Sequence, residues 1–203
     1  MDKVLTTTEF DENKALESAV SVFWEKGYEG ATLDDLIEAM GISRSTFNTV
    51  FGNKQSLFKL VLERYKKNTA VFMDEALALP NTQAVIKTLF HKVVDFLALS
   101  GNAHRCLSIQ SANAWGSDSE PIRMEMVEWR KQIEATLLKR FLKSKADADL
   151  PDAVNPEEVT RYMATLITGL AVQAANGATK SDMKRTVDLA LRLMRGVIFD
   201  VSK

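Results

Sequence analysis

Apolar residues recur every three or four positions along most of the chain, and no segment alternates apolar and polar residues as a half-buried strand does. This spacing gathers the apolar side chains on one stripe of a helix. Only nine glycines and four prolines interrupt the 203 residues, which disfavours a turn-rich β architecture. The pattern therefore predicts an all-α protein of about nine helices.

Start and stop signals bound these helices. Thr32 and Asp35 have the spacing of a capping box, and Asn155 precedes a proline and two acids, which favour a helix start. Asp11, Ser43 and Asn53 are also placed to cap a first turn. The expected helices cover residues 11–26, 33–40, 44–50, 54–79, 82–99, 105–115, 121–142, 156–176 and 180–201.

Composition excludes several classes of protein. The single cysteine rules out a disulfide framework within the chain, and with two histidines it does not complete a cysteine-based metal site. The chain shows no secretory signal and no run near the ~18 apolar residues of a membrane span. We therefore expect a soluble cytoplasmic protein with no membrane contact. No catalytic triad, phosphate-binding glycine loop or metal cluster is recognisable, so we expect neither an enzyme nor a cofactor.

Charge is distributed unevenly although the whole chain carries a net charge of −1. Residues 39–73 contain six basic residues and one acid, Glu63, whereas residues 1–38 contain ten acids and three bases. A stretch without acids inside an acidic neighbourhood favours an anionic partner. Chance clustering on solvated helix faces is the alternative.

Residues 33–50 have the form of a helix-turn-helix, with Gly41 at the turn. The apolar residues expected to face inward are Leu36, Ile37, Met40, Phe47, Val50 and Phe51. The polar residues left on the second helix are Arg44, Ser45, Thr46, Asn48 and Thr49. Hydroxyl, amide and guanidinium groups bind base edges and phosphates, and no carboxylate here repels them. Two helices packed around a glycine turn also occur in proteins that do not bind DNA.

Residues 10–58 resemble the amino-terminal domain of the TetR family of transcriptional regulators. The resemblance rests on the family's order and spacing over about fifty consecutive residues. The matching stretches are ALESA at 15–19, Phe23, GY at 27–28, AT at 31–32, LI at 36–37, MGIS at 40–43, FGNK at 51–54 and LF at 57–58.

The resemblance implies a homodimer that binds a palindromic operator in double-stranded DNA, usually as a repressor that a small-molecule effector releases. It implies phosphate contacts for Thr32 and Lys54, and groove contacts for Arg44 and Thr46. The full expected DNA-binding set is Thr32, Ser43, Arg44, Ser45, Thr46, Asn48, Thr49 and Lys54. We expect a DNA-binding domain at residues 8–68, and a helical ligand-binding and dimerisation domain at residues 69–203.

Two features depart from the family's pattern. Asn48 stands where the family usually has a tyrosine, and residues 1–10 balance Lys3 against Asp2 and Glu9 instead of forming a basic arm. We therefore expect fewer phosphate contacts than is usual for such a domain. These departures also leave an alternative function, a helical ligand-binding or scaffolding dimer with little or no operator binding.

The last two helices are expected to form the dimer contact as a four-helix bundle with the partner subunit. Small residues on the first helix allow close approach, and an apolar stripe follows the second. The expected interface residues are Gly169, Ala174, Leu189, Leu193 and Val197. The alternative is that this face belongs to the core of a single subunit.

An effector pocket is expected among the middle helices, where a few polar groups lie on apolar faces. The expected lining residues are Phe96, Cys106, Gln110, Asn113, Trp115, Trp129, Tyr162 and Thr165. Such residues at helical spacing also build ordinary cores. Cys106 follows His104 and Arg105 near an expected helix start, so it is either a sensor of oxidants or electrophiles or a small buried hydrophobe. Effector, operator and regulated genes are not readable from the residues.

Overall fold

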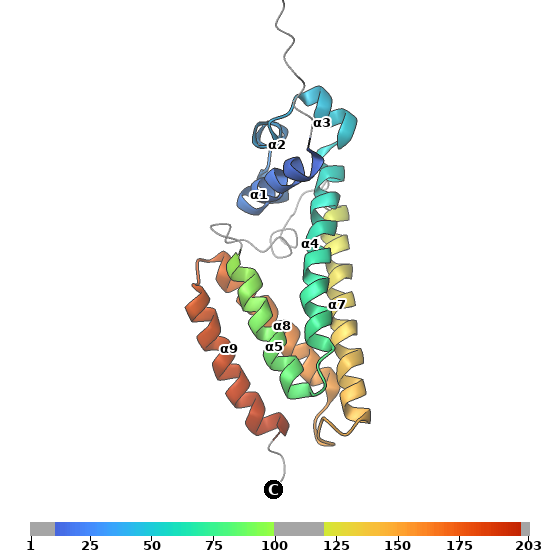
Figure 1. Ribbon diagram of the computed structural model, residues 1–203, viewed down its shortest axis with the longest axis vertical. Coiled ribbons are helices and arrows are strands. Elements are labelled where there is room, and N and C mark those ends of the chain that lie inside the picture. Colours follow the sequence, from blue (N-terminus) through green and yellow to red (C-terminus); the bar gives the residue numbers. More distant parts are fainter. Residues whose placement is uncertain (1–10, 100–119, 200–203) are drawn as a thin grey trace, which may run out of the picture.

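The computed structural model describes residues 11–99 and 120–199. These described residues form eight α-helices and a final π-helical turn, without a strand, which confirms the all-α prediction (Figure 1). The expected helix at 105–115 lies outside the described residues. The elements are α1 (Glu12–Gly30), α2 (Leu33–Met40), α3 (Arg44–Val50), α4 (Lys54–Leu77), α5 (Thr82–Leu99), α7 (Glu120–Ala146), α8 (Pro156–Ala175), α9 (Lys180–Met194) and η2 (Arg195–Phe199).

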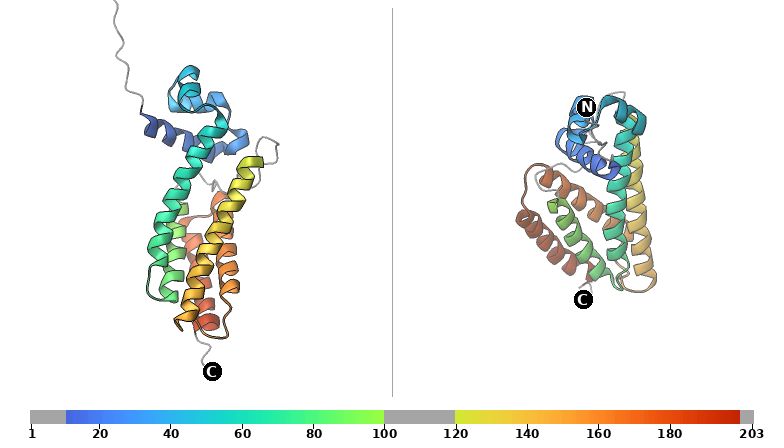
Figure 2. Two further views of the ribbon diagram at one scale, coloured as in Figure 1. Left: turned by 90° about the vertical axis from the view of Figure 1, so that its right-hand side faces the viewer. Right: turned by 45° about the horizontal axis from the view of Figure 1, so that its top comes forward.

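The helices form an elongated molecule with a small head at one end (Figure 1). The head consists of α1, α2, α3 and the first half of α4. The remainder of α4 enters the body, where it packs against α5 and α7, and α8 and α9 complete the body by packing against α7 and α5. Figure 2 shows α7 beside α4 over most of its length, so that two long helices connect body and head. None of the helices in residues 11–99 and 120–199 is long and apolar enough to cross a bilayer.

The expected helix starts are confirmed by their caps. The side chains of Asp11, Thr32, Ser43, Asn53 and Asn155 each accept a hydrogen bond from a backbone N–H in the first turn that follows. These bonds satisfy donors that have no partner within the helix. The predicted starts agree with the structure because a cap depends only on neighbouring residues.

Helix ends differ more from the prediction. Gly27 leaves the helical conformation (φ 72°), as expected for a stop, but the chain resumes a turn as far as Gly30. α7 continues four residues past Leu142 to Ala146, where Lys143 and Lys145 lie at the negative end of the helix dipole. α4 ends at Leu77, three residues before Pro80, and Arg140 of α7 donates to the carbonyl oxygens of Leu77 (3.0 Å) and Leu79 (2.9 Å) at and beyond the last turn.

Buried apolar side chains form two clusters that meet along α4. The head cluster contains Phe23, Phe47 and Phe58, and the body cluster begins at Met73. Two fully buried residues near the start of α7, Ile122 and Met126, belong to the head cluster. Burial of apolar surface therefore fastens the head to α7 as well as to α4. The domain boundary between residues 68 and 69 stays a prediction.

Candidate functional site

α3 lies at the end of the head (Figure 1), and most of its polar side chains are exposed to solvent. Phe47 is fully buried and its ring lies 5.8 Å from that of Phe51, which anchors the short helix. Val50 was expected to face inward, but it is 39% exposed, because a seven-residue helix offers its neighbours only a narrow face. The predicted residues Ser43, Arg44, Ser45, Asn48 and Thr49 are exposed and Thr46 is half-buried.

Local hydrogen bonds already engage some of these hydroxyls. Ser43 Oγ accepts from the Thr46 backbone N–H (3.0 Å) and shares a hydrogen bond with Thr46 Oγ1 (2.9 Å). Thr49 Oγ1 donates to the Ser45 carbonyl oxygen (2.9 Å). The side chains of Ser45 and Asn48 make no hydrogen bond with the described residues, so they are the polar groups of α3 most available to a partner.

Lys54 is held beside the start of α2. Its Nζ donates to the Ala31 carbonyl oxygen (3.0 Å) and lies 4.7 Å from the centre of the Tyr28 ring. A cation over an aromatic face is attracted to it, which fixes the direction of this long side chain. The ammonium group and the exposed Thr32 thereby share one edge of the head, where the positive end of the α2 dipole also favours an anion.

An ion pair that the sequence did not indicate joins the two helices of the motif. Arg44 Nη2 lies 2.6 Å from Asp34 Oδ1, and the two side chains are 62% and 84% exposed. Such an exposed pair contributes little to stability. A DNA phosphate or base that binds Arg44 must therefore displace the Asp34 carboxylate, at small free-energy cost.

Asp35 carries the capping box of α2. Its carboxylate accepts from Lys26 Nζ (2.7 Å) and from the Thr32 backbone N–H (2.9 Å), while the Thr32 hydroxyl caps the Asp35 N–H (3.1 Å). The hydrogen bond from Lys26, followed by those from Thr32, lowers the pKa of Asp35 from 3.8 to about 2. Folding of the head therefore favours the ionised form of the Asp35 carboxyl group.

Asp35→Asn is expected to flatten the acid dependence of stability. Because the folded pKa is lowered, the carboxylate stabilises the head above its unperturbed pKa of 3.8, and this contribution is lost as pH falls through about 2. Urea midpoints measured between pH 5 and pH 2 check this. Asp74→Asn is the control, since this exposed carboxylate of α4 forms no ion pair with the described residues. An unchanged pH slope in Asp35→Asn would contradict the assignment.

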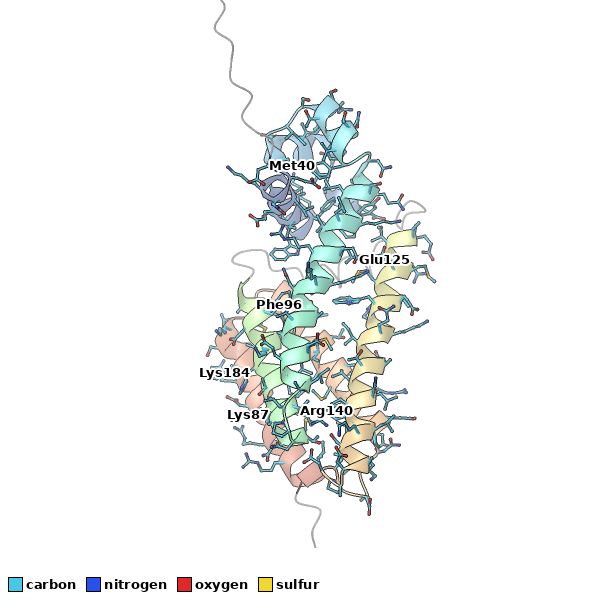
Figure 3. All side chains as sticks on the ribbon, turned by 45° about the vertical axis from the view of Figure 1, so that its right-hand side comes forward. Met40, Lys87, Phe96, Glu125, Arg140 and Lys184 are labelled. Atoms are coloured by element: carbon cyan, nitrogen blue, oxygen red, sulfur yellow. The ribbon has the colours of Figure 1, made fainter. Side chains whose placement is uncertain are left out.

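α4, α5, α7 and α8 line an apolar cavity of about 110 Å³. The Tyr65 ring lies 5.5 Å from Phe96 and 5.4 Å from Trp129, and Phe72 lies 5.3 Å from Phe96. Tyr65 belongs to the head cluster and Phe72 packs against the body cluster, so the cavity lies where the two meet. Figure 3 shows Phe96 on the part of α5 nearest the head. The cavity also contacts Arg130, Glu134 and Thr168.

The predicted effector residues are only partly brought together. Phe96 and Trp129 line the cavity, whereas Tyr162 and Thr165 lie on the exposed side of α8. The residues that α8 presents to the cavity are Ala164, Ile167, Thr168 and Ala171. Small or apolar residues occur on several faces of α8, so its sequence alone does not indicate the inward face. Cys106, Gln110, Asn113 and Trp115 lie outside the described residues.

α8 and α9 carry an exposed apolar face. Leu189 and Leu193 are 50% and 59% exposed one turn apart on α9, and Gly169 is open to solvent on α8. Ala174 instead packs within the body cluster of its own subunit. The side chain of Val197 lies outside the described residues. Tyr162 and Val172, which were not predicted for this face, are exposed at helical spacing from Gly169.

Comparisons with known proteins agree on one family. The model for bacterial regulatory proteins of the tetR family matches residues 15–61. A cysteine-substituted variant of the TetR family transcriptional regulator CifR, solved with a 26-base-pair double-strand operator DNA, is 30% identical, with coverage of 91% of this chain and 97% of that chain and a TM-score of 0.83.

Two curated relatives extend the similarity along the chain. The HTH-type transcriptional repressor ComR of Escherichia coli (strain K12) is 25% identical over 190 residues, which cover 91% of this chain and 89% of ComR. The HTH-type transcriptional repressor AcnR of Corynebacterium diphtheriae is 27% identical over 195 residues, which cover 95% and 96% of the two chains. The similarity therefore includes the body as well as the head.

Proposed function

This chain belongs to the TetR family of transcriptional regulators, and from that premise we propose a repressor that binds a palindromic operator as a homodimer under the control of a small-molecule effector. The observation that carries the proposal is the exposed, carboxylate-free polar side of α3, held on the head by the buried Phe47. The major groove of B-DNA is wide enough to admit such a helix.

Within this proposal the residues of the head divide into two kinds of contact. Arg44, Ser45 and Asn48 face base edges, since their side chains extend from the exposed side of α3. Thr32 and Lys54 bind a backbone phosphate at the start of α2, where helix dipole and ammonium charge act together. Ser43, Thr46 and Thr49 complete the surface with hydroxyls that exchange a local hydrogen bond for one to DNA.

Residues 8–68 are the proposed DNA-binding domain, and residues 69–203 are the proposed ligand-binding and dimerisation domain. The exposed apolar side chains of α8 and α9 support dimerisation, because large apolar side chains grouped on the surface mark protein contacts. A two-fold symmetric dimer then presents two α3 helices to half-sites about 34–36 Å apart. Since the proposed partner is chromosomal DNA, we also propose a cytoplasmic location.

The apolar cavity is the proposed effector site. A ligand there contacts Trp129 of α7 and Tyr65 of α4, the two helices that also enter the head cluster. It changes DNA affinity only as far as it binds one arrangement of these helices better than the other. Phe96 and Trp129 are proposed to contact the effector through their rings.

Arg44→Ala is expected to weaken operator binding by about 5- to 150-fold, or about 1–3 kcal/mol, because the guanidinium is proposed to bind a base edge through two hydrogen bonds. Lys54→Ala is expected to weaken all duplexes alike, since a phosphate contact carries no sequence information. Fluorescence anisotropy at fixed salt measures both variants on the operator, found by footprinting the promoter beside the gene, and on a scrambled duplex.

The affinities of wild-type protein and variants for the two duplexes distinguish operator binding through α3 from the alternative function. Unchanged operator affinity in Arg44→Ala would show that α3 does not read the groove as proposed. A wild-type protein that binds both duplexes equally weakly would favour the alternative function, a ligand-binding or scaffolding dimer.

A further inference from the structure

A second hollow, of about 250 Å³, lies between α5 and α9 and shares no lining residue with the effector cavity or with α3. The two helices run side by side in the body (Figure 1). The apolar base of this hollow, called here the α5/α9 groove, includes the buried Ile86 and Met194. Its polar residues include Lys87, His91, Asp188, Arg192 and Arg195. Figure 3 labels Lys87 on α5.

Among the described residues, few acids compensate the positive charge in the groove. Lys87, Arg192 and Arg195 form no ion pair with the described residues. The single acid among the lining residues, Asp188, lies 3.7 Å from His91 Nε2. Three other basic residues of the same helices have acidic partners, in the pairs Lys92–Glu75, Lys180–Asp95 and Arg185–Asp182, whereas the exposed Lys184 of α9 has none in the part of the chain that the structure describes. The groove therefore brings together three exposed cations that have no acidic partner among the described residues.

His91 gives a second, independent observation. Its Nε2 atom is buried and has no hydrogen-bond partner among the described residues. A buried polar atom without a partner is unfavourable, because it has given up water without gaining another bond. A ligand with oxygen atoms at the inner end of the groove would supply that bond.

The groove stays accessible in the proposed dimer. Asp188, Leu191 and Arg195 are spaced by three and four residues and thus share one flank of the helix. Leu189 and Leu193, which carry the exposed apolar face, lie about 100° or more around α9 from Asp188, Leu191 and Arg195. Arg192, three residues after Leu189, borders that face. A partner subunit packed on the two leucines therefore leaves the part of the groove between α5 and Arg195 open, with Arg192 at its border.

We propose that the α5/α9 groove binds a phosphate dianion, either free or as the end group of a small metabolite. Two guanidinium groups supply paired N–H donors with the geometry that suits oxyanions, and Lys87 adds a point charge. His91 Nε2 forms the remaining hydrogen bond. It donates to an unprotonated phosphate oxygen when it carries the ring proton, and it accepts from a protonated phosphate oxygen when Nδ1 carries the proton. The apolar base at Ile86 and Leu191 leaves room for the carbon part of an ester.

Isothermal titration with inorganic phosphate, at an ionic strength held constant with sodium chloride, tests the proposal on the full chain. Wild-type protein is expected to bind with a Kd of about 1 mM or below, and Arg192→Gln/Arg195→Gln is expected to weaken binding at least about tenfold. Lys14→Gln/Lys139→Gln removes the same charge from exposed positions without ion pairs among the described residues, and is expected to keep wild-type affinity.

Phosphorus NMR line widths give a second measurement of binding that does not depend on a heat signal. Titration with methyl phosphate distinguishes a phosphate ester from free phosphate as the natural ligand. An affinity for methyl phosphate equal to or above that for inorganic phosphate indicates the end group of a metabolite. A lower affinity indicates the free anion. Circular dichroism verifies that both double variants are folded. The proposal is wrong if neither method detects binding to wild-type protein, or if the two double variants lose affinity equally.

Discussion

Leu193→Glu is expected to convert the proposed dimer into monomers and to lower operator affinity by about 10²–10⁴-fold. Leu193 is 59% exposed in the single chain and lies one turn from the half-exposed Leu189. In a dimer joined through α8 and α9 the new carboxylate would be buried among apolar groups without a partner, which is strongly unfavourable. Each monomer then binds one half-site by itself, and the gain in affinity that comes from linking two binding sites is lost.

Sedimentation equilibrium and anisotropy on the operator measure the two effects separately. Leu142→Glu is the matched control, since Leu142 is also a leucine about half exposed (53%), but it lies on α7 outside the α8–α9 face. It is expected to leave both dimerisation and operator affinity unchanged. A dimeric Leu193→Glu protein would show that the subunits meet elsewhere.

Phe58→Ala is expected to lower the free energy of unfolding of the head by about 3–5 kcal/mol. Phe58 is fully buried, with its ring 4.9 Å from Phe23 and 5.0 Å from Tyr28, so its removal leaves a cavity between α1 and α4. Domains are stable by only about 5–15 kcal/mol in total. We therefore expect the head to lose most of its stability, and DNA binding with it, while the body retains its helices.

Urea unfolding followed by circular dichroism measures this loss. Phe58→Leu keeps an apolar side chain of intermediate volume, and most of the lost stability is expected to return. Val71→Ala shortens an exposed side chain on the same helix (57%) and is expected to change stability by no more than about 0.5 kcal/mol. A loss below about 1 kcal/mol in Phe58→Ala would mean that the ring contacts do not hold the head together.

The sequence was most informative where structure depends on neighbouring residues. The capping box of Thr32 and Asp35 and the cap at Ser43 were predictable, because a few adjacent side chains determine them. The hydrogen bond of Arg140 to the last turn of α4 was not, because it joins residues 63 positions apart in the chain. The packing of α7 against α4 and α8 likewise joins segments far apart in the chain, and no local pattern encodes it.

In the candidate site, too, features that depend on neighbouring residues were predictable, and features that depend on distant residues were not. The exposed polar side of α3 was predictable from the position of its apolar residues, with the exception of Val50. The pairing of Arg44 with Asp34 depends on the angle between two helices, and a sequence does not specify that angle. The exposure of Tyr162 and Thr165 depends on which side of α8 the body covers.

The insertion of Ile122 and Met126 into the head cluster limits how the head can move. A rigid head attached to a single helix would swing in any direction, whereas a head attached to both α4 and α7 rotates most easily about the line that joins its two attachments. In a symmetric dimer, rotation of the heads about this line changes essentially one quantity, the distance between the two α3 helices. Effectors of different shapes would then produce graded amounts of a single movement.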